Sequence, residues 1–238
     1  MQLITMSRRP AEASAVPTSV RVALVCMPFA HADRPSIQLG LISAIAEAAG
    51  FPTELFHFNL DLARELGAKP YYQLCQLGGR MTGEWLFAPS AFGDAAPGDE
   101  ESYLRCFPGE SEWAAELGKD ATFFRELRHQ ILPGFVERCF ASVSWGDYQV
   151  VGFSSLFQQN VASLALARRI KERHPGVRII FGGANMDGDM GAEYARSFAF
   201  IDYVVSGEAD EAFPKLLRMQ FTRRRRLRLI YDHTYSTG

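Results

Sequence analysis

Short apolar runs, each followed by a helix-forming segment, restrict the fold of this chain more than any other feature of its sequence. Arg21–Met27 reads RVALVCM, Gln149–Phe153 reads QVVGF and Val177–Phe181 reads VRIIF. Such runs are typical of strands that helices cover on both faces. Helical patterns follow the first two runs, at Ser36–Ala49 and Val161–His174. Because a helix that joins two parallel strands must cross over the sheet, this alternation predicts an open parallel sheet.

Two further strands complete the prediction, at Pro52–His57 and Tyr203–Val205, with two more helices at Met190–Ala199 and Ala209–Leu217. The apolar spacing of the longer helices supports them. One face of the first helix carries Ile37, Leu41, Ile45 and Ala48, and the helix after the third strand is expected to point Leu164, Ala167 and Ile170 inward. The fold class is therefore α/β, a flavodoxin-like or Rossmann-like open parallel five-stranded sheet with helices on both faces.

The chain divides into three parts by composition and pattern. Residues 1–19 have no hydrophobic period and are expected to form a flexible tail, and residues 20–217 form the α/β domain. Residues 58–148 are too long for one crossover and predict a helical insertion between the second and third strands. Its expected helices are Leu60–Leu66, Tyr71–Leu77 and Thr122–Val143, the last broken at Pro133, with a loop-like stretch at Gly83–Gly98.

The third part, residues 218–238, contains six of the arginines and one acidic residue. Residues 1–217 carry 19 basic and 26 acidic side chains, a net charge of −7, which argues against a nucleic-acid-binding face. The Arg-rich tail is either a basic patch for nucleic acid or acidic lipid, or an unrelated end left by a frameshift or premature stop. We favour the second interpretation and expect no contribution of this tail to the fold.

The four cysteines lie far apart in sequence and form no CxxC pair, so buried thiols in a reducing compartment are the simplest interpretation. Arg8-Arg9, the apolar stretch Val22–Ala30 and the Ala30–Ala32 triplet together imitate a signal peptide. That apolar stretch begins late, is short and continues into a helix, so it is better explained as a buried strand. We therefore expect a cytoplasmic protein without a membrane-spanning segment.

The carboxyl ends of the predicted strands are the expected ligand-binding edge of such a sheet. They read Met27-Pro28-Phe29, Gly152–Leu156, Phe181–Ala184 and Ser206–Glu208. Three of the four contain glycine, which lets a ligand approach the backbone, although glycines also end strands for local reasons. No GxxxxGK[ST] and no GxGxxG follows the first strand, which disfavours nucleotide phosphates held in that manner.

At these strand ends the sequence resembles a known family. The stretches Val151–Asn160 (VGFSSLFQQN), Ile179–Gly191 (IIFGGANMDGDMG) and Asp202–Pro214 (DYVVSGEADEAFP) are similar to the cobalamin-binding domain that precedes a radical SAM domain. With Gly83–Asp94 and Val22–Gly50, they resemble the ribosomal-peptide maturation radical SAM protein 1 family over residues 20–217. The resemblance implies a Rossmann-like domain that holds cobalamin as methyl carrier for radical C-methylation of a precursor peptide.

By position, the resemblance places Gly152 and Ser154 beside the benzimidazole tail of cobalamin, and Gly182 and Gly183 at its nucleotide end. For Ser154 a hydrogen bond to a ring nitrogen and a helix N-cap are both open. Gly207-Glu208 matches the start of the family's G-E-G element, with Ala209 in place of the second glycine. The expected cofactor-binding residues are Met27, Pro28, Gly152, Ser154, Ser155, Leu156, Gly182, Gly183, Ala184, Gly207 and Glu208.

Two departures from the family pattern limit what this chain is expected to do. The D-x-H-x-x-G motif is absent around His31, so we expect cobalamin in the base-off, His-off form with His31 an ordinary loop residue. No C-x-x-x-C-x-x-C is present, so the chain is expected to contain neither a [4Fe–4S] cluster nor a SAM site. Catalytic residues and metal ligands are therefore not predicted here, and catalysis would need a radical SAM domain or separate chain.

Two rival hypotheses stay open at this point. The chain is alternatively a stand-alone enzyme or binding module for a flavin or nucleotide sugar, with Glu208, Asp187 and Asp189 as the evident carboxylates near the strand ends. The second rival hypothesis is that the chain is a non-functional truncated product. No nucleic-acid or membrane partner is expected in any of these cases.

Overall fold

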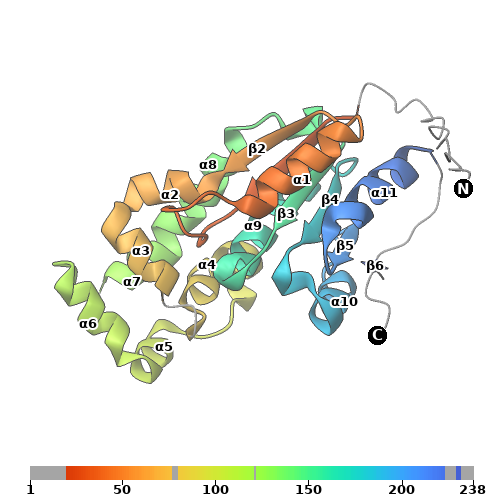
Figure 1. Cartoon of the computed structure of the whole chain (residues 1–238). Helices are drawn as coiled ribbons and strands as arrows, with labels where there is room; N and C mark the ends of the chain where they lie inside the picture. Colours follow the sequence, from red (N-terminus) through yellow and green to blue (C-terminus); the bar gives the residue numbers. More distant parts are fainter. Residues whose placement is uncertain (1–19, 77–79, 121, 223–228, 232–238) are drawn as a thin grey trace, which may run out of the picture.

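The computed structural model describes residues 20–76, 80–120, 122–222 and 229–231, so the predicted tail at 1–19 lies outside it. At its centre is a sheet with the strand order β2-β1-β3-β4-β5-β6 (Figure 1). All neighbouring strands pair in parallel. The strands are β1 (Val22–Cys26), β2 (Thr53–His57), β3 (Val150–Ser154), β4 (Arg178–Gly182), β5 (Tyr203–Ser206) and β6 (Leu229–Tyr231). The five predicted strands and the α/β class are confirmed.

Both faces of the sheet are buried, as the unbroken apolar runs predict. In β1, Val22 and Leu24 belong to the core on one face, whereas Ala23 and Val25 belong to the core on the other. All five residues of β1 are buried. A strand buried on both sides has no polar face, which explains why its sequence does not alternate.

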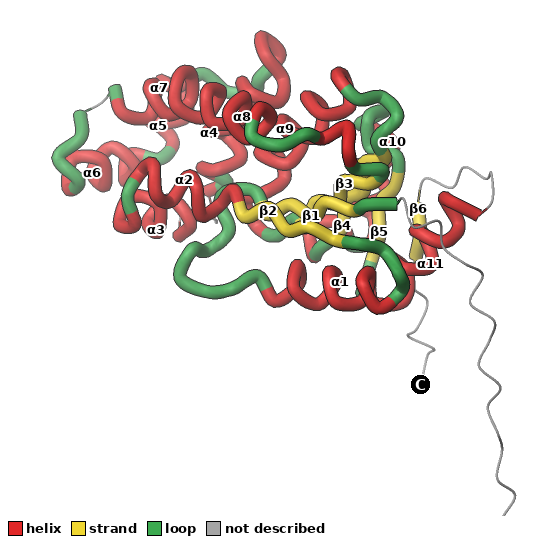
Figure 2. Tube along the Cα trace, turned by 90° about the horizontal axis from the view of Figure 1, so that it is seen from above, coloured by secondary structure: helices red, strands yellow, loops and turns green. Residues whose placement is uncertain are grey.

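The helices that connect the strands cover the two faces. They are α1 (Ile37–Ala48), α9 (Asn160–Arg173), α10 (Gly188–Ser197) and α11 (Ala209–Thr222). Figure 2 shows α1 and α11 on one side of the sheet and α9 on the other, and α10 packs on β5. Leu164, Ala167 and Ile170 of α9 are buried, as their spacing predicts. No helix in the described part of the chain is long and apolar enough to cross a lipid bilayer.

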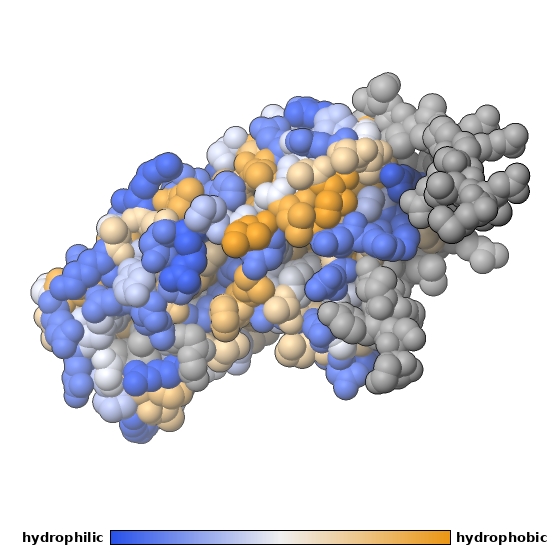
Figure 3. Space-filling view, in the orientation of Figure 1, coloured by the Kyte–Doolittle hydropathy of each residue, from blue (hydrophilic) through white to orange (hydrophobic). Residues whose placement is uncertain are grey.

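The apolar face that predicts α1 does not enter the core. Ile37 is 78% exposed and Leu41 is 47% exposed, whereas the buried positions of α1 are Leu39, Ser43 and Ala46. Figure 3 shows apolar side chains gathered on the surface over α1. The helical period locates the helix correctly here, but it does not identify which side of the helix meets the sheet.

The predicted insertion between β2 and β3 is a layer of helices. Its helices are α2 (Phe58–Leu66), α3 (Ala68–Gln76), α4 (Thr82–Phe92), α5 (Glu100–Cys106), α6 (Pro108–Glu116), α7 (Phe123–Glu126) and α8 (Leu132–Ala141). Of these, α4 and α8 pack directly against α9. The insertion therefore shares the core on the α9 face of the sheet rather than forming a separate body (Figure 1).

Two sequence predictions for the insertion are wrong. The stretch predicted as loop-like begins with α4, a helix that is buried on nearly all sides from Thr82 to Ala88. A helix buried all round has no amphipathic period, so pattern analysis misses it. The predicted break at Pro133 is absent as well. A π-helical turn at Leu127–Ile131 leads directly into α8, with Pro133 in its first turn, where a missing N–H is tolerated.

The C-terminal segment also differs from expectation. Helix α11 continues to Thr222, beyond the predicted end at Leu217. Strand β6 then adds a sixth, edge strand, which pairs with Val204–Ser206 of β5. The expectation that residues 218–238 lie wholly outside the fold is therefore wrong for α11 and β6.

Candidate functional site

A cavity of about 680 Å³ opens at the carboxyl ends of the central strands, between α1 and α11. The strand order reverses between β1 and β3, because one crossover leads outward to β2 and the later ones lead to β4 and β5. Ligands of open α/β sheets bind beside such a reversal. The volume lies within the range of small-molecule sites. The structure thus places a ligand-sized space at the edge where the sequence predicts one.

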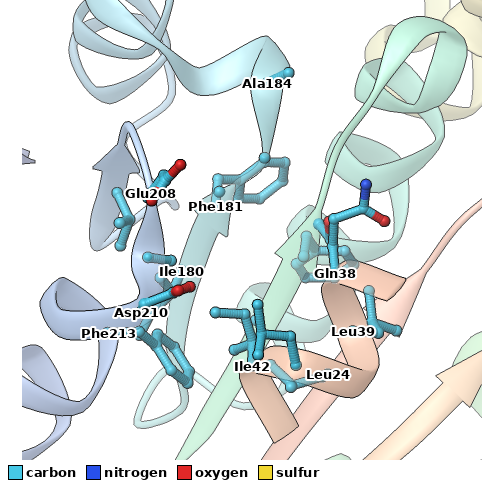
Figure 4. A pocket seen from close by; sticks show the side chains of 18 of the residues that line it. Leu24, Gln38, Leu39, Ile42, Ile180, Phe181, Ala184, Glu208, Asp210 and Phe213 are labelled. Carbon is cyan, nitrogen blue, oxygen red and sulfur yellow. The ribbon is translucent and has the colours of Figure 1, made fainter. Parts of the chain in front are cut away.

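Gly152 of β3, which carries no side chain, lies at the floor of this cavity. Leu24, Gly152 and Ile180 are register partners across β1, β3 and β4, and all three line the cavity. A Cβ on Gly152 would stand 2.7 Å from Leu24 Cδ2. Because Gly152 carries no side chain, the Leu24 side chain leans over it, and the slot is the space that remains between Leu24 and Ile180. Figure 4 shows Ile42 of α1 and Phe213 of α11 bounding this slot, which is therefore mainly apolar.

Polar groups lie at the rim of the cavity. Gln38 comes from α1, Ser154 from β3, and Asp187, Glu208 and Asp210 from the segments around α10 and α11. None of the described residues that line the cavity is Lys, Arg or His. The rim is therefore rich in hydrogen-bond acceptors and carries negative charge, which favours N–H donors over multiply charged phosphates.

Ser154 is available to a ligand. The 3-10 turn Phe157–Gln159 begins after Leu156, and α9 begins after Gln159, so Ser154 occupies neither N-cap position. Its hydroxyl also makes no hydrogen bond to any other described residue. The helix-cap interpretation of Ser154 is therefore wrong, and the hydroxyl is a free donor and acceptor at the rim.

The structure brings eight of the eleven predicted residues together at the cavity. They are Gly152, Ser154, Leu156, Gly182, Gly183, Ala184, Gly207 and Glu208. Met27, Pro28 and Ser155 do not line it. Met27 and Pro28 are buried, and the Met27 carbonyl accepts a hydrogen bond from Gln159 Nε2 at 2.5 Å. Ser155 is fully buried and donates from its hydroxyl to Asn160 Oδ1 at 2.6 Å. Met27, Pro28 and Ser155 therefore lie in the protein interior next to the ends of β1 and β3.

The glycines that line the cavity differ in why a side chain is absent at each position. Gly183 has a φ of +96°, and a Cβ there would stand 2.5 Å from the Ser155 carbonyl oxygen. The fold itself therefore requires Gly183. At Gly182 the nearest atoms to an added Cβ lie 3.9 Å away, an ordinary contact distance. Gly182 is thus a glycine whose missing side chain leaves space for a ligand, whereas at Gly152 the Leu24 side chain already lies where a Cβ would point.

The helical walls of the cavity were not predicted from the sequence. Leu39 and Ile42 come from α1, and Asp210 and Phe213 come from α11 (Figure 4). These residues lie inside the helices that follow the strands, not directly at a strand end, so no local sequence motif identifies them. Helices that follow β1 and β5 can only be assigned to one face of the sheet once the strand order is known.

The histidine and cysteine side chains that the structure describes lie outside the cavity. His31 Nδ1 lies 3.5 Å from Asp33 Oδ1 in the β1–α1 loop, and its ring contacts Tyr72 edge-on. The four cysteines are free, and burial raises the pKa of Cys26 to about 11. No group of three potential metal-ligating His, Cys, Asp or Glu side chains occurs within the described ranges.

Comparison with protein families, with characterised proteins and with solved structures finds no match to this chain. The chemistry of the cavity therefore has to be inferred from its own residues.

Proposed function

We propose that this chain binds cobalamin in the cavity between α1 and α11, as the cobalamin-binding part of a radical SAM peptide-maturation system. The observation that carries the proposal is the slot over Gly152. It lies beside the free hydroxyl of Ser154, and both residues belong to the stretch whose sequence resembles cobalamin-binding domains. A flat benzimidazole needs a narrow apolar space with one hydrogen-bonding group at its edge.

The walls of the cavity fit the nucleotide tail of cobalamin. Leu24 and Ile180 flank the slot, while Ile42 and Phe213 close it from the two helices. Burial of a ring between such side chains contributes about 25 cal/mol for each Å² of apolar surface removed from water. The backbone at Gly182 leaves further space for the ribose end of the tail.

The rim fits the amide-rich periphery of a corrinoid better than it fits a flavin or a nucleotide sugar. Carboxamide groups donate N–H bonds, and Asp187, Glu208 and Asp210 are acceptors. A nucleotide sugar brings a diphosphate and flavin mononucleotide brings a phosphate dianion, whereas the lining residues within the described ranges include no basic side chain.

The described side chains that line the cavity include no imidazole, so the proposed binding mode is base-off and His-off. When bound, cobalamin supplies a cobalt-carried methyl group, while this chain holds and orients the nucleotide tail. Acceptance of that methyl group by a precursor peptide would need the [4Fe–4S] cluster and SAM of a radical SAM domain or separate chain. By itself the described chain is proposed to bind and not to catalyse.

The test is an absorbance spectrum of the purified chain after mixing with cyanocobalamin and desalting. Stoichiometric retention of the corrinoid spectrum is expected, with no retention of flavin mononucleotide or a uridine-diphosphate sugar in parallel samples. Electron paramagnetic resonance of the cob(II)alamin complex should lack nitrogen superhyperfine splitting. Retention of a flavin or nucleotide sugar but not of cobalamin would replace the proposal by the rival function.

A further inference from the structure

The first turn of α4 provides the N-terminal cap of another helix. Glu84 is 7% exposed, and its carboxylate oxygens accept hydrogen bonds from Asn160 N at 3.0 Å and Val161 N at 2.7 Å. These are the first two residues of α9, whose own N-cap residue Gln159 makes no capping side-chain hydrogen bond. Carboxylates stabilise helix N-termini because the first N–H groups there lack partners inside the helix. Glu84 therefore caps α9 from within the insertion.

A second contact joins the insertion to the same loop. Gln158 Oε1 accepts a hydrogen bond from Gly83 N at 2.6 Å, and its Nε2 donates to the Leu74 carbonyl at 3.0 Å. Both ends of this buried amide thus bind the insertion. A Cβ on Gly83 would stand 2.5 Å from Phe29 Cδ2 and 3.0 Å from Gln158 Cβ, so only glycine permits this approach.

The opposite side of the loop is bound to the sheet. Gln159 Nε2 donates to the Met27 carbonyl, and Gln159 Oε1 accepts from Leu156 N at 3.1 Å. Leu156 itself lines the cavity, as does Ser154 two residues earlier. The segment that presents these two residues to a ligand is therefore held between the insertion and the end of β1.

The backbone of this loop is in a conformation that needs such support. Phe157 has a φ of +44° and is 78% exposed. Aromatic residues rarely adopt the left-handed region, and they keep it only where neighbouring contacts hold the chain. Asn185 Nδ2 donates to the Phe157 carbonyl at 2.8 Å, and Gln158 and Gln159 anchor the next two positions.

We infer that Glu84 is a positioning residue of the candidate cavity: its carboxylate fixes the β3–α9 loop, and ligand affinity depends on it although Glu84 does not line the cavity. The inference rests on the proposed function for the identity of the ligand. It also assigns a role to the helical insertion, which supports the ligand-binding loop from the α9 side.

The test compares two variants of the full chain by amide hydrogen exchange and by affinity for cyanocobalamin. Glu84→Met keeps the side-chain volume but removes both acceptors, and Glu84→Gln keeps one carbonyl acceptor. We expect Glu84→Met to speed exchange in residues 154–161, with β4 unchanged, and to weaken binding at least about tenfold. Glu84→Gln should fall between Glu84→Met and the unmodified chain. Glu172→Met, at the exposed far end of α9, is the matched control.

The two readouts separate this inference from the proposed function. If the unmodified chain does not bind cyanocobalamin, the proposed ligand is wrong, and loop exchange alone decides the role of Glu84. Unchanged loop exchange in Glu84→Met would overturn the inference, and so would unchanged affinity where the unmodified chain does bind. If Glu84→Met does not fold, Gln158→Met should give the same local loss of protection from exchange. Normal loop exchange in Gln158→Met would then overturn the inference.

Discussion

At the scale of single residues, Gly152 and Gly183 show that two glycines on neighbouring strands can be present for unrelated physical reasons. Sequence alone predicts that Leu at either position blocks ligand binding while the fold stays intact. The structure supports this only for Gly152, where an added side chain would meet the flexible end of Leu24 and enter the cavity. At Gly183 an added side chain meets backbone atoms of Ser155.

Gly152→Leu should therefore abolish retention of cyanocobalamin and lower the free energy of unfolding by about 1–3 kcal/mol, because the Leu24 side chain has to move. Gly183→Leu should lower that free energy by about 2–5 kcal/mol, because positive-φ strain and a backbone clash act together. Urea denaturation followed by circular dichroism measures both effects. Gly176→Leu, where an added Cβ meets nothing within 4 Å, is the control. Equal stability of Gly183→Leu and the unmodified chain would contradict the assignment.

At the scale of elements, α4 and α9 are joined through a buried carboxyl group whose protonation is coupled to folding. Burial raises the pKa of Glu84 from 4.5 to about 7, against the lowering effect of its hydrogen bonds from Val161 and Asn160. A raised pKa means that the folded state binds the proton more tightly than the unfolded chain does. The stabilisation that comes from protonation of Glu84 is thus complete below the unfolded pKa and is lost as the pH rises through about 7.

In the unmodified chain, the free energy of unfolding should fall by up to about 3 kcal/mol between mildly acidic and neutral pH, as Glu84 ionises. We expect this fall to be absent in Glu84→Gln. Urea denaturation across a pH series measures it, with Glu172→Gln on α9 as the exposed control. A pH dependence that is identical in Glu84→Gln and the unmodified chain would show that Glu84 titrates normally.

At the scale of the whole molecule, the sheet is completed by a segment that the sequence assigns to an unrelated tail. Strand β6 pairs with β5, and α11 reaches Thr222. A parallel edge strand adds backbone hydrogen bonds to β5 and covers its open edge. A chain that ends at Leu217 loses both β6 and the last turn of α11.

This shortened chain should unfold about 5 °C below the full chain, since a loss of about 1–2 kcal/mol lowers the midpoint by a few degrees in a protein of this size. Differential scanning calorimetry gives the midpoint. A second chain ending at Thr222 separates the effect of β6 from that of α11. Equal midpoints for all three chains would restore the interpretation of residues 218–238 as a dispensable tail.

The sequence by itself determined the order and type of strands β1 to β5 and of helices α1, α9, α10 and α11, but not of strand β6. Runs such as Ile179–Phe181 identify a strand because burial on both faces leaves no position for a polar residue. The glycines at three strand ends, Gly152, Gly182-Gly183 and Gly207, located the ligand-sized space, since the carboxyl ends of parallel strands meet at one edge. These properties are local, or follow from parallel topology alone.

Only the tertiary structure decided the rest, because it depends on which segments meet. Helix α4 has no amphipathic period, since neighbours bury it on all sides, so its sequence resembles a loop. Gly152 lies at the cavity floor because the register aligns it with Leu24 and Ile180, whereas Gly183 is required because it contacts the Ser155 backbone. The link from Glu84 to α9 spans 76 positions, a separation over which sequence pattern carries no information.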